Sequence, residues 1–156
     1  MTREDEIDQL NELIQVSKDA EQGYRTAAEN VSNSELETVF RGYAKQRAGF
    51  VKELEAEFAR LGGERTDSGT LSAALHRGWM DLKSALSGGD AAGMVAACES
   101  GEARAEATYA RAASTDVSGK GRSLIDKQWQ QIKEAHTRMH RLKDEMEDGT
   151  FFPKNE

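Results

Sequence analysis

The sequence predicts an all-α protein, and three observations lead to this expectation. The 156 residues contain a single proline, Pro153, so the 152 residues before it carry no obligatory helix break. Apolar residues recur at helical spacing in five stretches, which are separated by glycines or short polar turns. Charged residues make up 31% of the chain and hydrophobic residues 37%, a balance typical of amphipathic helices. An all-β fold would need turn residues about every 8–12 positions, so the sequence argues strongly against it.

Charge and cysteine content narrow the classes of partner and the compartment. The formal net charge of −7 argues against nonspecific binding of nucleic acid, which requires a cationic face. No run of about 18 apolar residues is present, so we expect no membrane span. The start, Met1 to Glu6, is acidic and lacks the apolar region of a secretory signal. The lone Cys98 has no partner for an internal disulfide, which suits a cytoplasmic location.

The first half of the chain predicts two long helices. The first should run from residue 3 to residue 30, with Thr2 as its N-cap. The second should run from residue 34 to about residue 61, where a Gly-Gly pair ends it. In the turn between them, Ser34 precedes Glu37 by three positions, so we expect these two residues to form a capping box.

The second half predicts two more long helices after a shorter one. The shorter helix covers about residues 70–86. Asp90 should cap a helix over residues 91–114, and a final helix should cover residues 122–148. Residues 150–156 are expected to form a C-terminal tail.

The lengths of the connections predict the topology. Two short turns make the first two and the last two long helices antiparallel pairs. The central connection of roughly 28 residues is long enough to travel the length of a bundle. We therefore expect residues 1–149 to form one ferritin-like four-helix bundle, with the helix at 70–86 inside the crossover.

Several stretches resemble a known family. They are Leu-Asn-Glu-Leu-Ile at 10–14, Leu-His-Arg-Gly-Trp-Met-Asp at 75–81, Cys-Glu-Ser-Gly-Glu at 98–102, and the region of His136. The chain is similar over nearly its whole length to a bacterial family of ferritin-like four-helix-bundle proteins of unknown function. The stretch from His76 to Asp81 is the most specific part. The resemblance implies a ferritin-like fold and implies no reaction.

Three polar residues stand on otherwise apolar helix faces. Glu21, Glu102 and His136 each lie within about 20° of apolar positions of their own helix, at 100° per residue. In the expected topology, all three lie roughly 17 Å from one end of the bundle, at about 1.5 Å per residue. Two carboxylates and an imidazole at one level suit iron, manganese or zinc. The sequence therefore offers Glu21, Glu102 and His136 as a candidate metal site.

A metal-free interpretation of the same residues stays open. No Glu-x-x-His motif occurs, although a ferritin-like di-metal centre requires two of them. The second helix instead brings Tyr43 and Arg47 to this level. Arg47 pairing with Glu21 or Glu102, with His136 and Tyr43 completing the hydrogen bonds, would make a buried network that needs no metal.

The remaining polar and aromatic candidates predict packing rather than chemistry. His76 is expected at a surface or packing position, Cys98 as a small core residue, and the tyrosines at 24, 43 and 109 as core aromatics. Trp79, Met80 and Leu86 give the crossover helix more apolar surface than one contact needs, which predicts a homodimer.

Two functions remain at this point, and no residue is assigned to catalysis. The first is a bundle without catalytic activity that acts by self-association or by binding a partner. The alternative is a metal-binding protein in iron or oxidative-stress handling.

Overall fold

The structure, a computed structural model, describes residues 1–64 and 90–150 as a set of four helices. These are α1 (Arg3–Asn30), α2 (Ser34–Arg60), α4 (Ala91–Ala113) and α5 (Gly119–Glu147). No strand occurs in these two ranges, so the all-α prediction is confirmed for them. The predicted helix at 70–86, with His76 and the apolar residues of the expected dimer surface, lies outside the described residues, as do residues 151–156 of the tail.

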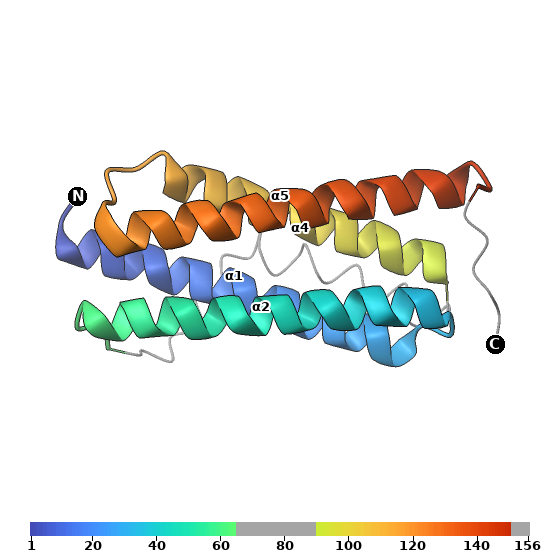
Figure 1. Cartoon of the computed structure of the whole chain (residues 1–156), viewed down its shortest axis with the longest axis horizontal. Coiled ribbons are helices and arrows are strands. Elements are labelled where there is room, and N and C mark those ends of the chain that lie inside the picture. The colour runs from blue at the N-terminus through green and yellow to red at the C-terminus, as the bar shows by residue number, and fades with distance from the viewer. Residues whose placement is uncertain (65–89, 151–156) are drawn as a thin grey trace.

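The four helices pack as two antiparallel pairs, as expected from the short turns (Figure 1). α1 packs along α2, and α4 packs along α5. The pairs meet where α1 contacts α4 and α2 contacts α5, while no Cα of α2 lies within 8 Å of a Cα of α4. α2 and α4 are therefore diagonal neighbours across the centre of the bundle. α2 ends and α4 begins at opposite ends of the bundle (Figure 1).

Side-chain caps begin three of the helices, and one of them differs from the prediction. Thr2 and Asp5 form a reciprocal capping box on α1, and the Asp90 side chain accepts from the Ala92 amide at the start of α4. The predicted Ser34 cap of α2 is wrong. Asn33 is the N-cap, and its side chain accepts from the Leu36 amide at 2.9 Å. Asparagine caps at least as well as serine, so the cap falls one residue earlier and Ser34 becomes the first helical residue.

Glycines set the end of α2 and the start of α5. Gly62 adopts φ +83°, and the Gly63 amide donates to the Phe58 carbonyl at 2.9 Å, which closes the last turn of α2. α5 begins at Gly119 rather than at Arg122. A Cβ on Gly121 would lie 3.2 Å from Val117 Cγ2, so the absence of a side chain lets the first turn of α5 fold back onto the preceding loop.

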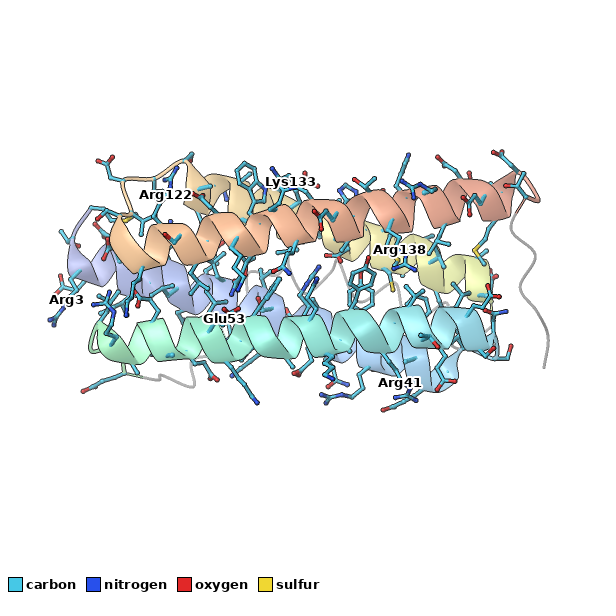
Figure 2. All side chains as sticks on the ribbon, in the orientation of Figure 1. Arg3, Arg41, Glu53, Arg122, Lys133 and Arg138 are labelled. Carbon is cyan, nitrogen blue, oxygen red and sulfur yellow. The ribbon has the colours of Figure 1, made fainter. Side chains whose placement is uncertain are left out.

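The core consists of two hydrophobic clusters with polar residues between them. One cluster gathers around Leu10, Leu54, Tyr109 and Ile132, and the other around Tyr24, Phe40, Met94 and Met139. Ser17, Arg47 and Glu102 occupy the stretches of α1, α2 and α4 that separate the clusters, and all three are buried. Figure 2 shows the side chains that fill and surround the bundle. None of the described helices is both long enough and apolar enough to cross a membrane.

The position of the α2 cap is testable. Replacing Asn33 with Ala removes the acceptor for the Leu36 amide, so the free energy of unfolding should fall by about 1 kcal/mol in a urea titration. The matched control Ser34→Ala should change it by less than half as much. A larger loss for the Ser34 variant would contradict the assignment of Asn33 as the cap.

Candidate functional site

A fully buried ion pair crosses the centre of the bundle. Arg47 of α2 and Glu102 of α4 are both 0% exposed. Arg47 Nη2 donates to Glu102 Oε1 at 2.7 Å and to Oε2 at 2.5 Å. The predicted pairing of Arg47 with one of the core glutamates is present, and Glu102 is its partner. Since α2 and α4 are diagonal, the long arginine side chain spans a gap that the backbones leave open.

Tyr24 of α1 completes this buried group. Its hydroxyl donates to Glu102 Oε2 at 2.5 Å. Burial and the negative charge of Glu102 raise the pKa of Tyr24 well above its usual value, so the phenol stays protonated and remains a donor. Burial opposes the charge of Arg47, but the carboxylate of Glu102 holds the pKa of the guanidinium above its usual value. The guanidinium of Arg47 thus stays charged, and Tyr24 holds the carboxyl group of Glu102 as a neutral donor.

The network differs from the prediction in its aromatic member. Tyr43 and His136 were expected to complete it, and Tyr24 does so instead. Tyr24 is 0% exposed, whereas Tyr43 is half-buried and packs its ring 5.4 Å from that of Tyr24. The difference arises because Tyr24 lies on the inner face of α1, opposite Glu102, while Tyr43 lies toward the side where α2 meets α5 and contacts Arg138.

A second buried chain of hydrogen bonds involves α5. The Tyr109 hydroxyl donates to Gln128 Oε1 at 2.7 Å and lies 3.1 Å from the hydroxyl of Ser17. Gln128 Nε2 in turn reaches the Phe50 carbonyl oxygen at 3.5 Å and Glu53 Oε1 at 3.4 Å. Together with the ion pair, these contacts join all four described helices through buried polar groups.

The other two residues of the candidate metal site lie elsewhere. The side chain of Glu21 is 21% exposed, and its Oε2 lies 3.3 Å from Nη2 of Arg25, one turn along the same helix. The side chain of His136 is 26% exposed and contacts carboxylates of α4. Glu21, Glu102 and His136 therefore each have a different set of partners.

His136 belongs to a cluster at the edge where α5 packs on α4. Its Nδ1 lies 2.5 Å from Glu106 Oε2, and its Nε2 lies 3.3 Å from Glu99 Oε1. The same Glu99 oxygen lies 3.5 Å from Nδ1 of His140, whose Nε2 lies 3.3 Å from Asp144 Oδ2. Burial lowers the pKa of His136, but its contacts with Glu106 and Glu99 outweigh burial and raise the pKa above its usual value. We refer to Glu99, Glu106, His136, His140 and Asp144 as the edge cluster.

As the described side chains stand, no group of three or more His, Cys, Asp or Glu residues is arranged to hold a metal ion. The inner carboxylate of Glu102 is held by Arg47 and Tyr24, so a cation there would compete with a guanidinium already in place. The edge cluster is the place in these ranges where imidazole and carboxylate groups from two helices converge.

Several of these residues, although not predicted as site residues, have a signal in the sequence. Gln128 lies between Ile125 and Ile132 at helical spacing, so its place on the inner face of α5 was readable. Glu99 and Glu106 lie seven residues apart, which places them on one face of α4. That face packs against the helix that carries the His136–x3–His140 pair.

Cys98 is a core residue, as expected. It is 0% exposed, and burial together with the charge of Glu102 raises the pKa of its thiol well above the usual value. A thiol in this setting stays protonated and is a poor nucleophile.

A comparison with protein families places the chain in one of them. The sequence pattern of the family described as "Domain of unknown function (DUF2383)" matches residues 5–115. The chain belongs to this family. No curated protein matches the chain. The matched range includes Tyr24, Arg47 and Glu102, whereas α5, with Gln128, His136 and His140, follows it.

The energetic role of the ion pair is testable. Replacing Arg47 with Met strands the Glu102 carboxylate in the core, so the free energy of unfolding should fall by about 3–5 kcal/mol in a urea titration. The double variant Arg47→Met/Glu102→Leu should be more stable than Arg47→Met alone, because no buried charge then lacks a partner.

The matched control is Arg25→Met, which breaks the exposed pair with Glu21 and should cost no more than about 1 kcal/mol. Equal losses for Arg47→Met and Arg25→Met would contradict a special role for the buried pair.

The state of Cys98 gives a second test. In the folded protein at pH 8, Ellman's reagent should leave the thiol unmodified over a time in which the urea-unfolded chain reacts completely, because the thiol is buried and its pKa is raised. Rapid modification without urea would show that the core around Glu102 is open to solvent.

Proposed function

We propose that this DUF2383 protein acts by association, with a second copy of itself or with another protein, and not by catalysis. The observation that carries the proposal is the state of the central polar groups. Arg47, Glu102 and Tyr24 are 0% exposed; Glu102 accepts from both of the others, and Arg47 Nη1 is buried without a hydrogen-bond partner among the described residues. Groups committed in this way stabilise the fold and are unavailable to a substrate.

The face between α2 and α5 offers a docking surface in the described part of the chain. Two adjoining hollows lie on it, of about 460 and 480 Å³, and they share Arg138. Arg138 extends over the ring of Tyr43 on α2, with 5.9 Å from the guanidinium carbon to the ring centroid; both helices and this arginine are visible in Figure 2. Arg141 lines the same surface, and arginine and tyrosine are the residue types that most often anchor protein interfaces.

The character of the surface favours a reversible complex. Among the described residues, Met1 is the only large hydrophobic side chain that is exposed. An interface built from arginine, tyrosine and half-buried apolar groups such as Val39 and Leu142 resembles non-obligate interfaces rather than the apolar surfaces of permanent dimers.

The remaining parts of the proposal concern architecture and setting. We propose a ferritin-like topology in which the connection between α2 and α4 crosses the bundle, supported by the opposite positions of the end of α2 and the start of α4 (Figure 1). We further propose a bacterial protein that forms a homodimer in the cytoplasm. The single buried cysteine supports a reducing compartment, and the net charge of −7 argues against nucleic acid as the partner.

A second candidate function is binding of a metal ion, in iron or oxidative-stress handling. The sequence suggested three residues for such a site, Glu21, Glu102 and His136. Of these, only His136 lies in contacts that favour metal binding. The favouring observation is the position of Glu99 Oε1, which lies within 3.5 Å of a ring nitrogen of both His136 and His140.

The association function is testable by crosslinking in cells. A photo-reactive benzoylphenylalanine in place of Thr137, an exposed residue beside the second hollow, should give a light-dependent adduct to a second copy or to another protein. The matched control places the same residue at Ala107, an exposed position on α4, and should give no adduct. Absence of an adduct at 137, or equal adducts at both positions, would overturn the docking surface.

A further inference from the structure

Two distances in the edge cluster match the ligand spacing of a tetrahedral metal site. Glu99 Oε1 lies 3.3 Å from His136 Nε2 and 3.5 Å from His140 Nδ1. Zinc bonds to nitrogen and oxygen of about 2.0–2.1 Å place adjacent ligand atoms about 3.3–3.4 Å apart in a tetrahedron. Each imidazole thus lies at about the right distance from the shared Glu99 oxygen to be its neighbouring corner in such a polyhedron.

Glu106 supplies the support that a metal-binding histidine usually has. Its carboxylate lies 2.5 Å from His136 Nδ1, on the opposite side of the ring from Glu99. A carboxylate at Nδ1 keeps the proton on that nitrogen, orients the ring and makes Nε2 the ligand atom. Glu106 therefore holds His136 with Nε2 toward Glu99 and His140.

The charges around the cluster favour a cation. Glu99, Glu106 and Asp144 contribute three carboxylates, and their ion-pair partners within 4.0 Å in the described ranges are the rings of His136 and His140. No lysine or arginine of these ranges neutralises them at that distance, unlike Glu102, which has Arg47. A divalent ion at this edge would bring positive charge to three carboxylates that no lysine or arginine of the described ranges pairs with.

We propose that Glu99, His136 and His140 bind one divalent transition-metal ion of the zinc type at the α4–α5 edge, with Glu106 as the positioning residue. This inference rests on the second candidate function and names its site. As the Nε2–metal bond forms, the Nε2 proton of His136 leaves to solvent. The Nδ1 proton stays on the ring and keeps its hydrogen bond to Glu106. Two imidazoles with one carboxylate favour Zn²⁺, Cu²⁺ or Ni²⁺ over Mg²⁺ or Ca²⁺, which prefer oxygen ligands only.

Closing the site requires small side-chain movements, in accord with the lack of a ready three-ligand arrangement. The side chain of His140 is 59% exposed, so its ring can turn toward the ion with little steric resistance. His136 is more enclosed, at 26%, and stays in place as the fixed ligand.

The probe for the test is Zn²⁺ added to the full chain after removal of metals with a chelator. Calorimetric titration should give one Zn²⁺ per chain, and Zn²⁺ at about 100 times its Kd should raise the melting temperature by about 5–10 °C. His136→Ala and His140→Ala should each abolish both effects while circular dichroism shows an unchanged helix content. Glu106→Gln should weaken binding by about 10–100-fold, as loss of a supporting carboxylate does.

Two variants serve as controls and separate the alternatives. His76→Ala and Glu21→Gln should bind Zn²⁺ as the parent chain does. Binding that survives both His136→Ala and His140→Ala but is lost in Glu21→Gln would overturn this site and leave the metal function standing. Absence of Zn²⁺ binding would overturn both, and the crosslinking result alone would then decide the association function. An unchanged affinity in Glu106→Gln would overturn its positioning role.

Discussion

The Arg47–Glu102 pair constrains the whole bundle because it joins two helices, α2 and α4, whose backbones lie on a diagonal and do not approach each other directly. α2 and α4 lie on a diagonal, and a fully buried charge on either one would be costly without the other. Tyr24 ties α1 to the same carboxylate. Because these contacts lie between the two hydrophobic clusters, they fix how far each helix can slide along its neighbours. A shift of one turn would leave Arg47 or Glu102 facing apolar side chains.

This constraint also decides where other chemistry can reside. A core carboxylate that already accepts from a guanidinium and a phenol has little capacity left for a metal ion or a substrate. At the edge, by contrast, Glu99 and Glu106 have only imidazole partners among the described residues, and those partners are partly open to solvent. The fold therefore separates a closed polar centre, which stabilises the bundle, from a polar edge whose side chains are partly open to solvent.

The sequence predicted much of this arrangement, because helical periodicity and equal distances from the helix ends are enough to place Arg47 and Glu102 on inner faces at one level. It could not choose between Tyr24 and Tyr43, since both lie on apolar stripes and the roll of each helix about its own axis decides which ring points to the centre. The same roll leaves the Glu21 side chain partly exposed, beside Arg25 of its own helix, and places His136 against carboxylates of α4. A rotation of a few tens of degrees, below the resolution of a 100° periodicity argument, separates a core ligand from an edge ligand.

The two polar regions differ in how much of each lies within the residues that the family pattern matches. Tyr24, Arg47 and Glu102 all fall within residues 5–115, so the buried ion pair and its tyrosine donor come entirely from the part of the chain that the family pattern matches. The edge cluster draws Glu99 and Glu106 from that range, but both of its imidazoles come from α5, which follows it. The family match therefore covers every residue of the buried centre. It does not cover the two histidines of the edge cluster. α5, which completes the bundle by packing on α4, is also the helix that brings an imidazole within 4 Å of the Glu99 and Glu106 carboxylates of α4.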